Sequence, residues 1–151
     1  MEEYIQYGYY GLFFASFLAA TILPISSEVI FIALLVSDFN PILLLLSATL
    51  GNWLGGMTNY YLGYLGKSEW IEKYFHVSTD KIKQIKEKIY NKGAFMAFFC
   101  FLPAIGDIIG FALGFMRANA IIVNISMFIG KLFRYLVLLY AFNHGIKYLL
   151  P

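Results

Sequence analysis

The sequence predicts an all-α integral membrane protein, and three observations support this fold class. Of its 151 residues, 60% are hydrophobic and only 13% are charged, whereas about 25% of the residues of a soluble domain are charged. Two apolar runs, at about 42–66 and 119–150, are long enough to cross a bilayer as helices. Two others, at about 9–37 and 94–116, are interrupted by proline. A water-soluble fold is therefore disfavoured.

The first apolar region is expected to form two half-helices, because Pro24, Ser26, Ser27 and Glu28 interrupt it. Proline removes a backbone donor and clashes with the preceding turn, and Ser27 can cap a new helix. A half-helix of about 12 residues rises about 18 Å, less than the roughly 30 Å of a hydrocarbon core. The region therefore predicts a re-entrant hairpin. No basic residue precedes it, so the first segment is expected to be retained rather than cleaved as a signal peptide.

The second apolar region predicts a transmembrane helix that carries polar side chains. Asn52, Asn59 and Tyr61 are candidates for lining a cavity, although asparagine and tyrosine also join membrane helices to one another. Glycines here and in the third region fall at spacings that allow helix backbones to approach closely. These glycines are Gly51, Gly55, Gly56, Gly63, Gly106, Gly110 and Gly114.

A basic linker at 67–92 separates the two apolar halves and contains seven of the eleven Lys and Arg residues. The positive-inside rule places this linker in the cytoplasm. Residues 78–92 predict an amphipathic helix with isoleucines on one face, either lying on the inner leaflet or serving as a solvated connector. A net charge of +2, concentrated in this linker, does not indicate nucleic-acid binding.

The third apolar region is broken in the same way as the first. Pro103, Gly106 and Asp107 interrupt it, and Asp107 is expected to cap the helix that follows. This region also predicts a re-entrant hairpin.

The fourth apolar region predicts a transmembrane helix with two cations, Lys131 and Arg134, near its middle. Their spacing of three puts both on one helical face. Because a cation near mid-bilayer reaches an interface with difficulty, both are expected to point inward at a carboxylate or a bound anion. A purely structural ion pair is the alternative.

An internal repeat relates the two halves. A shift of 79 positions pairs the proline and the carboxylate of one break with those of the other. With this shift, twelve of the 52 residues in 15–66 are identical to their counterparts in the second half. A re-entrant hairpin does not cross the membrane, so a unit of one hairpin and one transmembrane helix crosses it once. Because this number is odd, the second copy must be inverted, as in many secondary transporters. The predicted architecture is two inverted repeats, about 11–66 and 93–150, in a single membrane domain, with both termini facing outward.

Glu28 and Asp107 are the candidate functional residues. An ionised carboxylate is costly in a low-dielectric region, so such a group takes up a proton readily and can carry it. Ionisable residues inside a membrane usually mark a transport pathway. The structural alternative is that both cap helices or pair with a buried cation.

The sequence contains no catalytic constellation. It has no nucleophile elbow, no P-loop and no zinc spacing around His76 or His144, which are expected at the membrane interfaces. The single cysteine, Cys100, has no partner for a disulfide or a thiolate metal site. Enzyme activity, cofactors and metals are therefore not expected.

Several loose motifs follow one another in an order that is fairly specific. They are Pro24-Ile25-Ser26-Ser27-Glu28, Gly51-Asn52-x-x-Gly55, Tyr61-x-Gly63-x-x-Gly66, Lys92-Gly93, Phe101-Leu102-Pro103 and Gly114-Phe115-Met116. Over about residues 12–142 the chain resembles the DedA family, also called VTT or SNARE-associated Golgi-type membrane proteins, and its short YqaA-type branch. The resemblance implies opposed re-entrant hairpins, residence in the bacterial cytoplasmic membrane, and transport of lipid head groups coupled to the proton motive force.

The chain departs from the family pattern where arginines flank Phe-x-Pro, because Cys100 and Gly106 stand at those positions. The leading hypothesis is a proton-coupled flippase or scramblase of a lipid phosphate, either undecaprenyl phosphate or a phospholipid. In it, Glu28 and Asp107 exchange protons, and Arg134 with Lys131 neutralises the head group. A structural or assembly protein with static ion pairs and a transporter of a small solute or ion are the alternatives. Lipid and protons are the expected partners, and the sequence leaves homo-oligomerisation open.

Overall fold

The computed structural model describes residues 2–21, 26–66, 80, 83–84, 87, 92–102 and 105–146. These residues are mostly helical and include no strand. The elements are α1 (Glu2–Ala19), α2 (Ser27–Val36), α3 (Pro41–Leu65), α6 (Gly93–Phe98), the 3-10 helix η1 (Phe99–Phe101), α7 (Ile105–Phe115), α8 (Ala120–Ala141) and the π-helix η2 (Phe142–Ile146). Pro24, Pro103 and the isoleucine face of the predicted linker helix lie outside the described residues.

Both interrupted regions are broken, as the sequence predicts. α1 ends at Ala19 before α2 begins at Ser27, and η1 ends at Phe101 before α7 begins at Ile105. α2 and α7 have 10 and 11 residues, which corresponds to about 15–17 Å and is too short to cross a bilayer core. The expected 12-residue half-helix is wrong for α1, which has 18 residues. Its extension to Glu2 fits the preference of acidic residues for a helix N-terminus.

Within the described residues, two helices are long and apolar enough to cross a membrane, judged by length and composition. They are Pro41–Leu65, with 25 residues, and the run Ala120–Gly145, with 26. Both expose large apolar side chains, among them Ile42 at 66% and Ile121 at 71%. Extended apolar surface of this kind is unfavourable in water and natural in contact with lipid.

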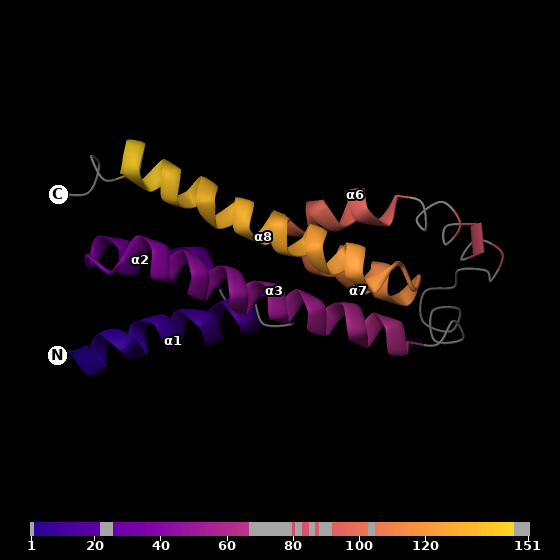
Figure 1. Ribbon diagram of the computed structural model, residues 1–151, viewed down its shortest axis with the longest axis horizontal. Coiled ribbons are helices and arrows are strands. Elements are labelled where there is room, and N and C mark those ends of the chain that lie inside the picture. Colours follow the sequence, from indigo (N-terminus) through magenta and orange to yellow (C-terminus); the bar gives the residue numbers. More distant parts are fainter. Residues whose placement is uncertain are drawn as a thin grey trace. The chain divides into compact units, whose positions relative to one another are not determined.

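The chain divides into two compact units, each with the helices of one interrupted region and part of each long helix (Figure 1). The first unit comprises Met1–Gly55 and Phe128–Pro151, and the second comprises Gly56–Met127. In the first unit, α1, α2, the N-terminal half of α3 and the C-terminal half of α8 surround one apolar core. This core consists of Leu12, Phe31, Leu35, Leu44, Ala48, Tyr135 and Phe142.

The second unit packs through glycine. A side chain on Gly63 would meet the Phe111 carbonyl, and one on Gly114 would meet the Tyr60 carbonyl, so α3 and α7 approach through their backbones. The Tyr60 hydroxyl, on a side chain that is 1% exposed, donates to the carbonyl of Ala118. The predicted close packing of the glycine-spaced helices is present in this unit.

The turns that lead from α2 into α3 and from α7 into α8 have the same geometry. Asp38 and Arg117, 79 positions apart, both adopt left-handed backbone, with φ of 58° and 55°. Two residues later, Asn40 Oδ1 accepts from the amides of Ile42 and Leu43, and Asn119 Oδ1 accepts from those of Ile121 and Ile122. Asparagine caps both helices at the same register, so the 79-residue repeat extends to local structure at this turn.

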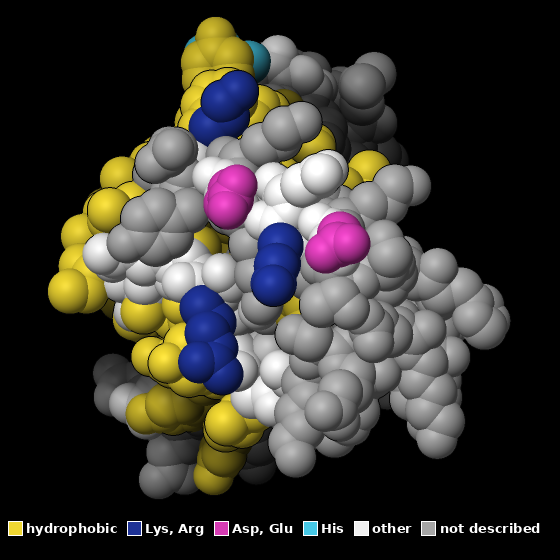
Figure 2. All heavy atoms as spheres, turned by 90° about the vertical axis from the view of Figure 1, so that its right-hand side faces the viewer, with side chains coloured by type: hydrophobic (Ala, Val, Ile, Leu, Met, Phe, Trp, Pro, Cys, Tyr) yellow, Lys and Arg dark blue, Asp and Glu magenta, His cyan; other side chains and the backbone are white. Residues whose placement is uncertain are grey.

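Charged side chains of both signs are exposed in the second unit. Asp80, Lys83 and Glu87 are helical, and all three side chains are exposed. Figure 2 shows Lys, Arg, Asp and Glu side chains on the face turned toward the viewer, with hydrophobic side chains beside them. Charges gathered in this way belong in water or among lipid head groups.

The glycine contacts give a test of the packing. Gly114→Ala would place a methyl group against the Tyr60 carbonyl, and overpacking of this kind costs about 1–3 kcal/mol. We expect a lower thermal unfolding temperature for this variant in detergent. Gly11→Ala is the matched control, since nothing lies within 4 Å of its new methyl group. Equal unfolding temperatures for the two variants would contradict the close approach of α3 and α7.

Candidate functional site

The start of α2 presents three polar side chains in succession. Ser26 occupies the N-cap position, but its side chain makes no capping hydrogen bond. Its hydroxyl instead donates to Glu28 Oε2 at 3.0 Å. The expectation that Ser27 caps this helix is wrong, because Ser27 is the first helical residue and its hydroxyl lies 2.8 Å from the Tyr135 hydroxyl. Glu28 lies in the first turn, where the helix dipole favours a negative charge.

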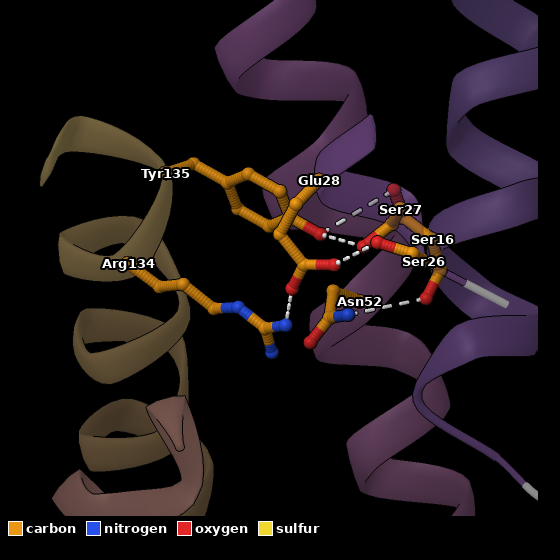
Figure 3. A network of polar contacts seen from close by, with 7 residues as sticks. All are labelled: Ser16, Ser26, Ser27, Glu28, Asn52, Arg134 and Tyr135. Atoms are coloured by element: carbon orange, nitrogen blue, oxygen red, sulfur yellow. Dashed lines mark hydrogen bonds and ion pairs between the residues drawn. The ribbon is translucent and has the colours of Figure 1, made fainter. Parts of the chain in front are cut away.

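Arg134 of α8 forms an ion pair with Glu28 (Figure 3). The pair joins Nη2 of the guanidinium to Oε1 of the carboxylate, and the two side chains are 13% and 25% exposed. Both charges are therefore largely removed from solvent. An unpaired charge in such a buried position would be costly. The inward-pointing cation expected from the sequence thus has a carboxylate partner.

Three buried hydroxyl groups form a chain beside this ion pair (Figure 3). The Tyr135 hydroxyl donates to Ser16 Oγ at 3.5 Å. Because a tyrosine has one hydroxyl hydrogen, Ser27 Oγ is then the donor to Tyr135. Ser16, Ser27 and Tyr135 are each 0% exposed. The chain ties α1 and α2 to α8 at the level of Glu28.

Asn52 connects α3 to the same network. Its amide nitrogen donates to the backbone carbonyl of Ser16 at 3.3 Å. Asn52 and Thr49, one helical turn earlier, are each 1% exposed. Among the described residues, no hydrogen-bond partner reaches Asn52 Oδ1 or Thr49 Oγ1. Two buried oxygen atoms therefore remain unsatisfied on one face of α3.

The structure places the remaining candidates as follows. Lys131 is 1% exposed on α8 in the first unit. Asp107 is the third residue of α7, in the first turn and partly buried, so the expectation that it occupies the cap position is wrong. Asn59 is 7% exposed, while Tyr61 is 53% exposed and its neighbour Tyr60 is the buried tyrosine.

Gly106 is buried, and a side chain there would collide with the carbonyl of Cys100. A larger residue at this position would require the backbone to shift. Among the described residues, no group of three or more His, Cys, Asp or Glu is placed to hold a metal ion.

Sequence reasoning missed Ser16, Thr49 and Tyr135 as site residues. Ser16 and Thr49 stand singly within apolar runs, and a lone hydroxyl in a membrane helix commonly bonds to its own backbone. Tyr135 follows Arg134 directly, and this adjacency to a buried cation was the one available signal.

These features define a class of protein: a small helical membrane protein with an ion pair where an interrupted helix begins again. The chain belongs to the VTT-domain family, also called DedA, because the VTT domain matches residues 23–144. It is 35% identical over 144 residues to the inner membrane protein YqaA of Escherichia coli, covering 92% of this chain and 94% of that protein. It is also 35% identical over 137 residues to an uncharacterized protein of Haemophilus influenzae, covering 85% and 83%.

No solved structure matches the chain. With its two candidate spans and its inner-membrane relatives, the chain is an integral protein of the bacterial inner membrane.

The ion pair can be tested by charge removal. Arg134→Gln leaves Glu28 without its counter-charge, and we expect a loss of about 1–3 kcal/mol, less than for a fully buried pair because both side chains retain some exposure. The Glu28→Gln, Arg134→Gln double variant should recover most of this loss, since no unpaired charge remains. Thermal unfolding in detergent measures both. A double variant less stable than Arg134→Gln would contradict the pairing.

Proposed function

We propose that this chain moves a lipid phosphate between the two leaflets and couples the movement to protons. The observation that carries the proposal is the Glu28–Arg134 ion pair at the start of α2. Arginine binds a phosphate through a planar fork of N–H donors. A carboxylate on the same guanidinium competes with that phosphate.

Protonation of Glu28 would remove this competition. The neutral acid no longer holds Arg134, which is then an unpaired cation in a low-dielectric region and favours an anion. Proton and phosphate would thus bind together, and for a singly charged phosphate their charges cancel, so that the net charge of the site would not change. Loss of the proton restores the ion pair and expels the phosphate. This is the physical basis of the proposed coupling.

Lys131, buried on the same helix, adds positive charge and takes over, with Arg134, the role of the family arginines absent at Cys100 and Gly106. Asp107 holds the corresponding position in the second repeat and is proposed to exchange protons as Glu28 does. Asn52, Asn59 and Tyr61 are proposed to line the path. The proposed substrate is either undecaprenyl phosphate or a phospholipid, and leaflet exchange measured with each lipid distinguishes the two.

The proposed architecture is the inverted one, in which α1 with α2, and α6 with α7, each form a re-entrant hairpin. Two features support it: the short lengths of α2 and α7, and the repetition of the Asp38 turn at Arg117. An odd number of crossings per repeat requires inversion. The linker 67–92 would then lie in the cytoplasm.

Leaflet exchange in proteoliposomes tests the function. With fluorescent phospholipid or labelled undecaprenyl phosphate, we expect exchange by the wild-type protein to accelerate as the loading side is acidified, because protonation frees Arg134. Glu28→Gln combined with Asp107→Asn should abolish this pH dependence, because neither side chain can exchange a proton. It should also slow exchange by roughly ten- to a hundredfold, the range for one hydrogen bond to a charged group, because no carboxylate can re-form the ion pair and expel the phosphate.

Asp38→Asn is the matched control, since Asp38 is exposed and asparagine tolerates its left-handed backbone. Its exchange rate should equal that of the wild type. No exchange by the wild-type protein, or unchanged exchange by the double variant, would contradict the proposal and favour a structural protein with static ion pairs.

Cysteine labelling tests the topology. In a Cys100→Ala background, Ser26→Cys should react with a membrane-impermeant reagent added from outside, and Lys83→Cys only from the cytoplasm. Both positions are exposed, so a failure to label does not follow from burial in the protein. Labelling of Ser26→Cys from the cytoplasm alone would show that the inverted arrangement is wrong.

A further inference from the structure

Two unsatisfied oxygens, Thr49 Oγ1 and Asn52 Oδ1, are the least explained feature of the first unit. Both belong to side chains that are 1% exposed. Buried polar atoms almost always have partners, so each exception requires an explanation. Their spacing of three residues puts them on one face of α3. The two oxygens therefore mark one stretch of α3 that lacks hydrogen-bond partners among the described residues.

The orientation of Asn52 is fixed by its other contact. Its Nδ2 donates to the Ser16 carbonyl, and a flipped amide would set oxygen against oxygen. Oδ1 must then face away from Ser16, and it can only accept hydrogen bonds. In the view of Figure 3, Oδ1 points toward the side of the network on which Arg134 lies. The missing partner at this atom is a donor.

The charges of the site restrict what that donor can be. Glu28 and Arg134 already neutralise each other, so a bare metal cation would add an uncompensated positive charge in a low-dielectric region. A phosphate monoester offers mainly acceptor oxygens, which suit Arg134 and leave Asn52 Oδ1 unsatisfied. A ligand that carries both an anionic phosphate and N–H or O–H donors would satisfy both sets of atoms.

We infer that Thr49 and Asn52 form a second subsite, which accepts hydrogen bonds from the polar group attached to the phosphate of a phosphodiester lipid. The inference rests on the proposed function and deepens it. It predicts a preference for head groups with N–H or O–H donors, such as ethanolamine or glycerol. Trimethylammonium head groups, which have no such donor, and bare phosphate monoesters are disfavoured.

Two variants remove the subsite in different ways. Thr49→Val replaces a hydroxyl with a methyl group of similar size, and because that hydroxyl has no partner, we expect an unfolding temperature at or above that of the wild type. Asn52→Leu removes the acceptor together with the bond to Ser16. Asn143→Leu is the control, since Asn143 is exposed near the end of the last helical segment. Thr49→Val keeps the test valid if Asn52→Leu fails to fold.

The measurement compares head groups in two assays. Proteoliposomes report the leaflet exchange of tail-labelled phosphatidylethanolamine, phosphatidylglycerol, phosphatidylcholine and undecaprenyl phosphate. Purified protein in detergent reports the thermal stabilisation by glycerophosphoethanolamine and glycerophosphocholine, which does not depend on transport. The wild type should favour the donor-bearing head groups by at least roughly two- to tenfold, the ratio expected for one hydrogen bond to a neutral acceptor. Thr49→Val should reduce this ratio to about one by slowing only the donor-bearing head groups. Asn52→Leu should also reduce the ratio to about one, whatever its effect on the overall rate, and the control should retain the wild-type ratio.

The outcomes separate this inference from the proposed function. The subsite would be overturned if the wild type showed no head-group preference, or if Thr49→Val left the preference unchanged. An ordered water would then be the partner of both oxygens, and the proposed lipid exchange would not be affected. Equal slowing of every lipid would overturn it in favour of a structural role. Selective stabilisation by glycerophosphoethanolamine without any lipid exchange would support the subsite and contradict the flippase.

Discussion

The helix interruption between α1 and α2 is the constraint on which the first unit depends. Backbone that leaves the helical path inside an apolar region must find polar partners within the protein, because lipid offers none. Four helices supply polar groups where α2 begins: Ser16 from α1, Ser27 from α2 itself, Asn52 from α3 and Tyr135 from α8. The apolar core containing Phe31 holds these helices together. The apolar packing of the first unit and the hydrogen bonds of its buried polar groups therefore both depend on the same four helices.

Electrostatics adds a second condition at that level. Arg134 is acceptable in an apolar helix because Glu28 neutralises it, and Glu28 is acceptable in part because the start of α2 favours a negative charge. Neither charge is stable alone, so any event that neutralises one releases the other toward a new partner. If an ion pair only stabilised the fold, apolar residues could replace it with little loss of stability. If the pair must open for function, the same replacement would abolish that function.

The sequence predicted the features governed by local rules and missed those that depend on distant contacts. Proline and a following carboxylate mark both helix breaks, and long apolar runs mark both spans. The Ser27 cap failed because a tyrosine 108 positions away holds its hydroxyl, and no local pattern encodes that distance. Adjacent tyrosines 60 and 61 differ by about 100° around α3, and only tertiary packing decides that Tyr60 is the buried one.

The two repeats share a register, but the buried positions of α2 and α7 hold different residues. This difference is one reason why the polar network lies in the first repeat. Ser27, Phe31 and Leu35 form the buried stripe of α2, and the positions 79 residues later are Gly106, Gly110 and Gly114, the buried stripe of α7. α2 packs through these side chains, and Ser27 forms a hydrogen bond with Tyr135. In α7, glycines bring the backbone against the carbonyls of Tyr60 and Cys100. A carboxylate at the start of each stripe is common to both. The second repeat thus has its carboxylate beside closely packed backbone, whereas the first pairs its carboxylate with Ser26 and Arg134, close to a chain of buried hydroxyl groups. The proposed recognition of head groups is therefore expected to depend on the first unit.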